Sequence, residues 1–168
     1  MNKFIAELRT TFAHLSHPYK VMIAGTFDIL HTGHLYLIDK AAEIGEVYVI
    51  IARDASVTKF KGQKPIMPEL QRMKIIQHIR GVKNVELGSD KEDWLVRIVE
   101  INPDLFLLGP NQWGNEEKYE QQAKKLGAHT IFRRLTEMDT EFPLNSSTKI
   151  KEKILICYKS SNQKSPSS

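Results

Sequence analysis

The fold is decided by the stretch Gly25-Thr26-Phe27-Asp28-Ile29-Leu30-His31-Thr32-Gly33-His34. It follows an apolar run at 21–24 that is short enough to be a buried strand, and it precedes a segment at 35–44 with apolar residues at helical spacing. Gly45 then ends the predicted helix. This order of strand, sharp turn and helix places His31 and His34 beside a helix N-terminus. The first N–H groups of a helix are unpaired and its dipole favours negative charge, so the stretch predicts an anion site.

Length and composition indicate one globular domain. The chain has 168 residues, of which 41% are hydrophobic and 26% are charged. The net charge of +4 suits anionic substrates and is too small to indicate nucleic-acid binding. The single cysteine, Cys157, excludes an internal disulfide framework and a multi-cysteine metal site. With no signal-peptide pattern and no apolar run near the ~18 residues of a membrane span, we expect a cytoplasmic protein with no membrane partner.

Strands and helices alternate along the chain. Predicted strands lie at about 20–25, 47–52, 84–88, 104–109 and 129–132. Predicted helices lie at 35–44, 68–80, 91–101, 116–126 and from Ser146 or Ser147 to Ile156, with a basic loop at 59–65. The alternation predicts an α/β fold: a single doubly wound, Rossmann-like domain with a mostly parallel five-stranded sheet. Polar clusters at 26–34, 53–54, 111–112 and 146–148 are then expected to meet at the carboxyl edge of the sheet, where such folds bind ligands.

The two ends of the chain differ from the predicted domain at 20–158. Residues 1–19 form a predicted helical extension, with Phe4, Ile5, Leu8, Phe12 and Leu15 at helical spacing. We expect this helix to pack on the domain or on a second subunit, and it is the basis for a predicted homodimer. Residues 159–168 are rich in Ser and Lys and are predicted to be a disordered tail.

The polar clusters favour chemistry on phosphates. The glycine fingerprints of dinucleotide and P-loop sites are absent, and no serine or cysteine stands in a nucleophile elbow. Instead, His31, His34, Lys61, Lys64 and Arg72 surround a helix N-terminus. This set suits attack by a substrate phosphate on the α-phosphate of a nucleoside triphosphate, with loss of pyrophosphate. The attacking phosphate is already anionic, so catalysis would rest on positioning and charge stabilisation.

Each cluster also has a purely structural interpretation. The two histidines could be turn residues or half of a zinc site, although no cysteine or further histidine pair stands nearby to complete one, and no metal-ligating residue is predicted. Lys59, Lys61 and Lys64 could form only a solvated loop. Residues 146–148 could be only a helix cap, although a cap can also bind phosphate.

Residues 25–34 match in full the GTFDxxHxGH signature of the cytidylyltransferase-like nucleotidyltransferases, and the chain resembles that family on this ground. Further segments are similar to its archaeal FAD synthetase branch: 52–54, 61–66, 68–72, 103–104 and 108–112. The resemblance covers roughly residues 20–155. It implies the HxGH nucleotidyltransferase fold and transfer of a nucleotide to a phosphorylated acceptor.

The resemblance also implies roles for individual residues. The catalytic group would be His31 and His34, which contact the triphosphate, with Lys61 or Lys64 at the α-phosphate or the substrate phosphate. Asn111 would lie near the ribose or base. The implied nucleotide-binding residues are Thr26, Phe27, His31, Thr32, Gly33, His34, Arg72, Asn111, Ser146, Ser147 and Thr148. The implied acceptor-binding residues are Asp28, Arg53 and Asp54.

One departure bears on the substrates. Cytidylyltransferases of glycerol phosphate and choline phosphate carry an RTxGISTT-like run with an arginine directly before it, whereas this chain has Phe142 to Lys149 there, with Arg133 and Arg134 further upstream. This favours an FMN adenylyltransferase that uses ATP, FMN and a divalent cation, expected to be Mg²⁺. The alternatives are a CTP-dependent enzyme acting on glycerol 3-phosphate or another phospho-alcohol, an enzyme with phosphopantetheine as acceptor, and a non-catalytic nucleotide-binding module.

Overall fold

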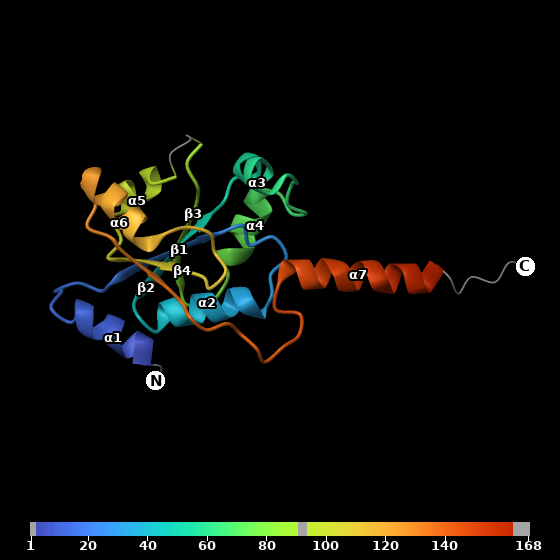
Figure 1. Ribbon diagram of the computed structural model, residues 1–168, viewed down its shortest axis with the longest axis horizontal. Coiled ribbons are helices and arrows are strands. Elements are labelled where there is room, and N and C mark those ends of the chain that lie inside the picture. The colour runs from blue at the N-terminus through green and yellow to red at the C-terminus, as the bar shows by residue number, and fades with distance from the viewer. Residues whose placement is uncertain (1–2, 91–93, 163–168) are drawn as a thin grey trace, which may run out of the picture.

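The computed structural model describes residues 3–90 and 94–162, which form a three-layer α/β fold around one parallel sheet (Figure 1). All strand pairs are parallel, so the predicted fold class is confirmed. The strand order is β3-β2-β1-β4-β5. The strands are β1 Lys20–Gly25, β2 Glu46–Ile51, β3 Val82–Leu87, β4 Leu105–Leu108 and β5 Ile131–Arg134. The order reverses between β1 and β4, and the carboxyl ends of these two strands flank the point where such sheets bind ligands.

Helices cover both faces of this sheet. They are α1 Lys3–Phe12, α2 Thr32–Ala42, α3 Asp54–Lys61, α4 Glu69–Ile76, α5 Val96–Ile101, α6 Glu116–Lys125 and α7 Ser147–Asn162. In β1, Val21 and Ile23 join a core with residues of α1, α2 and α4, while Met22 joins a second core with residues of α5 and α6. This alternation along one strand is what a sheet buried on both faces requires.

The N-terminal extension belongs to the first of these cores. Ile5 is fully buried, and Leu8 and Phe12 are 5% and 6% exposed. The apolar face of α1 is therefore used within its own chain, which is one of the two placements that its spacing predicted. No helix in the described part of the chain is long and apolar enough to cross a membrane.

Several predicted boundaries were wrong, among them that of the helix predicted at 68–80, which ends at Ile76. Residues 54–61 form α3 where a basic loop was predicted from 59, and Gly62, at φ 70°, ends that helix. The last helix does not end at Ile156, since α7 runs to Asn162. Residues 159–162 are therefore helical, and the rest of the predicted tail lies outside the described residues. The helix predicted at 91–101 begins only at Val96, and residues 91–93 are not described.

Candidate active site

The carboxyl edge of the sheet carries the sequence 25–34 as a turn between β1 and α2. Phe27 adopts a positive φ of 49° and is 2% exposed, so the turn reverses sharply over a buried ring. The ends of β1 and β2 are level, because the pairing runs from Lys20 opposite Glu46 to Gly25 opposite Ile51. The turn after β1 therefore lies beside the polar residues that follow β2.

The two histidines are brought together as predicted. Their rings stack with centroids 3.6 Å apart. His31 is the N-cap of α2, and its Nδ1 accepts a hydrogen bond from the backbone N–H of His34 at 3.3 Å. Because Nδ1 is an acceptor there, the proton of a neutral His31 ring lies on Nε2. His31 can therefore donate Nε2–H to an anion at the N-terminus of α2.

Burial keeps His34 uncharged. Desolvation, followed by the charges of His31 and Lys61, lowers the pKa of His34 to about 3. Burial lowers the pKa of His31 as well. Nδ1 of His34 is buried without a hydrogen-bond partner among the described residues. A buried polar atom without a partner is unusual in a folded protein.

Lys61 is the lysine that reaches the turn. It is the last residue of α3, and its Nζ donates to Thr26 Oγ1 at 3.0 Å. Its side chain thus carries a positive charge beside the two histidines. Lys64 lies on the exposed loop that follows α3. Of the two predicted lysines, Lys61 bonds to the turn in the described structure. Lys64 stays a prediction, based on its place in the loop.

The start of α7 packs directly on the histidine turn. A Cβ at Gly33 would lie 2.5 Å from the carbonyl oxygen of Asn145, so only glycine permits this approach. Ser147 Oγ donates to the Ile29 carbonyl at 3.4 Å, and Ser146 Oγ accepts from the N–H of Lys149 at 3.3 Å. The serine segment is therefore a helix cap, as one interpretation predicted. It also lies next to the N-terminus of α2, as the functional interpretation requires.

Asp28 joins three segments instead of facing an open site. It is 4% exposed; Oδ1 accepts from the N–H of Met67 at 2.9 Å and Oδ2 from Nζ of Lys151 at 2.9 Å. Burial alone would raise the pKa of Asp28, but these hydrogen bonds and the positive charge of Lys151 hold it below its usual value. Asp28 thus connects the turn, the loop before α4 and α7. Sequence reasoning missed Lys151, which looks like any other lysine in the first turns of a helix.

Arg72 holds the turn in place with its side chain. It is fully buried; Nη1 donates to the Thr26 carbonyl, Nε to the Met67 carbonyl at 2.9 Å, and Nη2 to the Ala52 carbonyl at 2.7 Å and Asp54 at 2.6 Å. Its guanidinium is therefore occupied by protein groups. The sequence predicted that this side chain contacts a nucleotide. In the structure it contacts protein groups instead.

The polar residues after β2 also bind one another. Arg53 donates to the Gly88 carbonyl at 2.9 Å and pairs with Glu69 at 3.0 Å. The backbone N–H of Asp54 donates to Glu69 at 2.7 Å. Together with Arg72 they join the ends of β2 and β3 to α4. Arg53 and Asp54 are thus at the predicted edge, with their charges satisfied inside the protein.

The loop after β4 is held by Arg134. The guanidinium donates to the carbonyls of Gly109, Gln112 and Gly114 and pairs with Glu116 at 2.7 Å. This loop carries Asn111, whose Nδ2 contacts Sδ of Met138 at 3.3 Å. The neighbouring Arg133 pairs with Glu120. In the described part of the chain, these two arginines bond to the loop after β4 and to α6, and neither bonds to the 25–34 turn.

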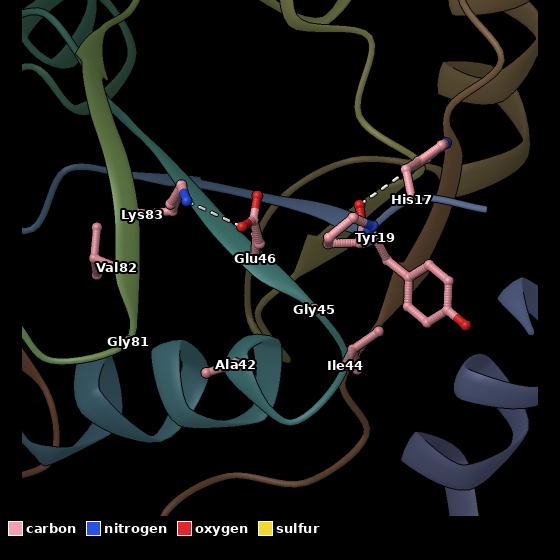
Figure 2. A pocket seen from close by; sticks show the side chains of 10 residues that line it. His17, Tyr19, Ala42, Ile44, Gly45, Glu46, Gly81, Val82 and Lys83 are labelled. Atoms are coloured by element: carbon pink, nitrogen blue, oxygen red, sulfur yellow. Dashed lines mark hydrogen bonds and ion pairs between the residues drawn. The ribbon is translucent and has the colours of Figure 1, made fainter. Parts of the chain in front are cut away.

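A separate hollow of about 650 Å³ lies at the other end of the sheet (Figure 2). It is lined by residues at the start of β1, β2 and β3, including Tyr19, Glu46 and Val82. Lys83 and Glu46 form an ion pair of 3.1 Å across it. All the site residues predicted from sequence lie at the opposite, carboxyl edge, so this hollow is not the candidate active site.

Known proteins resemble both the sequence and the fold. A FAD synthase of Methanocella paludicola is 40% identical over 136 residues, covering 80% of this chain and 95% of the relative. A FAD synthase of Methanobrevibacter smithii is 38% identical, covering 80% of this chain and 90% of the relative. A lipopolysaccharide core biosynthesis protein of Thermoplasma volcanium has a similar solved structure, with a TM-score of 0.69 and 31% identity over 73% of this chain and all of that one.

The model of the family described as cytidylyltransferase-like matches residues 22–153, from β1 into α7. The match includes the histidine turn, Lys61 and the serine segment that packs on the turn. The family that the sequence motif indicated is thus confirmed, and the chain is a nucleotidyltransferase of the cytidylyltransferase-like family.

Proposed function

We propose that the protein is an FMN adenylyltransferase, which makes FAD and pyrophosphate from ATP and FMN. The observation that supports this reaction best is the stacked His31–His34 pair at the N-terminus of α2 with Lys61 beside it. The curated archaeal relatives at this level of identity are FAD synthases, which points to ATP and FMN as the substrate pair.

The site suits in-line transfer to an anionic acceptor. A phosphate oxygen of FMN bonds to the α-phosphorus of ATP while the bond from that phosphorus to the bridging oxygen breaks. Pyrophosphate leaves with the electron pair. No strong base is needed, because the attacking phosphate is already anionic. Nε2–H of His31, the first N–H groups of α2 and the ammonium of Lys61 then stabilise the charge that develops on the phosphates. Neutral rings fit this role, since each neutral imidazole still has one N–H to donate.

The remaining predicted residues fall into two groups. Arg72, Arg53, Asp54 and Asp28 hold the turn and its surroundings in place through the contacts described above, and we propose a positioning role for them. The residues kept as proposed contacts of substrates are Thr26, Phe27, Thr32, Gly33, Lys64, Asn111, Ser146, Ser147 and Thr148. Of these, the residues of the turn lie beside the N-terminus of α2, and the residues at 146–148 lie at the N-terminus of α7. A helix N-terminus attracts phosphate.

The described residues offer no ready cage for a resident metal ion. Among the described residues there is no group of three or more His, Cys, Asp or Glu side chains that could hold one. Asp28, the carboxylate nearest the histidines in sequence, is paired with Lys151. Mg²⁺ is commonly bound through substrate phosphates with few protein ligands, so we expect a divalent cation to arrive with ATP. The steps above do not depend on it.

The test is pyrophosphate release from the purified chain with Mg²⁺, crossing ATP and CTP with FMN, glycerol 3-phosphate and phosphopantetheine. We expect turnover with ATP and FMN, and FAD as the product by chromatography. Turnover only with CTP and a phospho-alcohol would replace the proposed substrates while keeping the reaction type. Nucleotide binding without turnover in any combination would make the chain a binding module. We also propose a cytoplasmic location, which fractionation of cells that express the chain would test.

A further inference from the structure

Phe60, in the last turn of α3, is 80% exposed although it lies on the side of the helix that faces the domain. Val57, one turn earlier on that side, is buried. The opposite side of α3 carries Ala55 and Lys59, which are exposed as a solvent-facing side should be. Phe60 therefore extends past the part of the domain that covers Val57, and most of its ring is open to solvent.

The contacts of neighbouring residues show which way Phe60 faces. Arg53, the N-cap of α3, lies about two turns before Phe60 and so on nearly the same side of the helix. Its Nε donates to the carbonyl of Gly88, which directly follows β3, at 2.9 Å. Lys61 lies about 100° further around α3. Its Nζ donates to Oγ1 of Thr26 in the histidine turn at 3.0 Å. The end of α3 thus holds an aromatic ring on the β3 side and an ammonium group on the β1 side.

The edge of the sheet below this end of α3 carries small residues. Ala52 follows β2 and Gly88 follows β3, so neither position extends a long side chain across the edge. The backbone N–H of Gly88 donates to the Ile51 carbonyl at 2.9 Å, which keeps the two strand ends level. A flat group can therefore lie against the backbone there.

The two groups at the end of α3 suit the acceptor of the proposed reaction. FMN carries a flat, largely apolar isoalloxazine ring and a phosphate, held apart by its ribityl chain. The side chains of Phe60 and Lys61 diverge in the same way, with one group for each end. Aromatic rings attract flat rings in offset stacks or edge contacts, and ammonium groups form charge-assisted hydrogen bonds to phosphate. Glycerol 3-phosphate has the phosphate but no ring, and would leave Phe60 unused.

We propose that Phe60 binds the flavin ring of the acceptor. Its side chain stacks on the isoalloxazine of FMN, which lies over the ends of β2 and β3, while Lys61 binds the phosphate beside the histidine turn. This inference rests on the proposed function and adds the residue that selects a flavin over a phospho-alcohol. Because the ring is remote from the reacting phosphates, its contact acts on acceptor binding more than on the chemical step.

The first test is steady-state pyrophosphate release with ATP and FMN. We expect Phe60→Ala to raise the KM for FMN about tenfold, the size of one lost ring contact, with much smaller changes in kcat and in the KM for ATP. Phe60→Trp restores an aromatic ring and should keep the KM for FMN close to that of the wild type. The matched control is Leu70→Ala. Leu70 is 62% exposed and lies on the opposite side of α4 from the buried Arg72, so its loss should change no kinetic constant.

Two partial acceptors separate the ring from the phosphate. Riboflavin has the ring without the phosphate, so it should compete with FMN in the wild type and about tenfold less well in Phe60→Ala. Its inhibition should persist in Lys61→Met. Glycerol 3-phosphate has the phosphate without the ring, so its competition with FMN should weaken in Lys61→Met and stay the same in Phe60→Ala.

A binding measurement needs no turnover. An indole stacked on an isoalloxazine quenches flavin fluorescence by electron transfer. We expect FMN to be dimmer when bound to Phe60→Trp than when bound to the wild type, with ATP omitted. Leu70→Trp places the same indole on the side of α4 that is turned away from the site, so FMN bound to that variant should be as bright as in the wild type.

The outcomes distinguish this inference from the proposed reaction. Turnover of ATP and FMN with a KM for FMN that stays unchanged in Phe60→Ala would overturn the ring site and leave the reaction in place. A larger rise in the KM for ATP than for FMN would also overturn it, since Phe60 would then contact the adenine. FMN binding that depends on Phe60, without turnover, would overturn the reaction and support the ring site. A wild type that does not bind FMN would overturn both.

A further variant tests the other exposed apolar residue near Lys61. Ile66 is 63% exposed and precedes Met67, whose N–H bonds to Asp28 of the histidine turn. We expect Ile66→Ala to change the KM for FMN less than Phe60→Ala does. The reverse order would overturn the assignment, because the flavin ring would then lie beside the loop before α4 instead of over the ends of β2 and β3.

Discussion

Asp28 and Lys151 lie 123 residues apart in sequence, and their side chains form an ion pair of 2.9 Å that connects the histidine turn to α7. Asp28 is almost fully buried, so its charge depends on this partner and on the N–H of Met67. The pair therefore fixes the serine segment at the N-terminus of α7 against the site.

Replacing Lys151 should loosen this connection. Lys151→Met leaves the carboxylate of Asp28 without its cationic partner, at a cost of about 1–3 kcal/mol in the free energy of unfolding. We expect a raised KM for ATP in steady-state assays, with Lys151→Arg restoring most of it. Lys153→Met, two residues along the helix and exposed, is the matched control. An unchanged KM in Lys151→Met would show that the position of α7 does not affect substrate binding.

Removing either histidine should impair the chemical step. His31→Ala and His34→Ala each remove a ring from the stacked pair, and we expect kcat for pyrophosphate release to fall by roughly two or more powers of ten. His78→Ala, at an exposed position after α4, should keep wild-type turnover. Near-normal rates in both site variants would exclude the proposed role of the pair.

Arg72 should matter for stability more than any exposed arginine. Its guanidinium satisfies three carbonyls and Asp54 in a fully buried position. Removing one partner of a buried ion pair costs about 3–5 kcal/mol. We therefore expect Arg72→Met to lower the free energy of unfolding by this amount in urea titrations. Lys74→Met, exposed on the same helix, should change little. Equal effects of the two substitutions would contradict the supporting role of Arg72.

Stability should depend on pH through His34. The unfolded chain takes up a proton on this residue near its ordinary pKa of 6.5, whereas the folded protein does not until about pH 3. Protons therefore favour the unfolded state, and the stability contributed by neutral His34 is present above about pH 6.5 and is lost as the pH falls toward 3. Urea unfolding from pH 7 to 5 should show a steeper decline for the wild type than for His34→Gln, and parallel declines would refute the assignment.

The sheet and the histidine turn could be predicted from the sequence because their signals are local. Val47 to Ala52 is an unalternating apolar run, which is typical of a strand buried on both faces, and β2 occupies 46–51. The helix after the turn follows from its apolar spacing and from Gly45. The closeness of His31 and His34 follows from their three-residue separation at a helix start, whereas the stacking of their rings was not predicted.

Other parts could not be predicted because they depend on distant residues. Of the eight residues of α3, only Val57 is buried, so the helix has no apolar stripe to reveal it. Arg72 resembles a phosphate ligand in sequence, and only the fold shows three carbonyls around it. Lys151 has no local signal either, since its partner Asp28 comes from the other end of the chain.

The close approach of Gly33 to Asn145 has a consequence for protein synthesis. The turn leaves the ribosome long before Asn145, whose backbone packs against it. A nascent chain that already contains all five strands still lacks the backbone that packs on Gly33 beside the candidate site. Chains that stop between Arg134 and Asn145 can thus carry the histidine motif and the whole sheet without this contact.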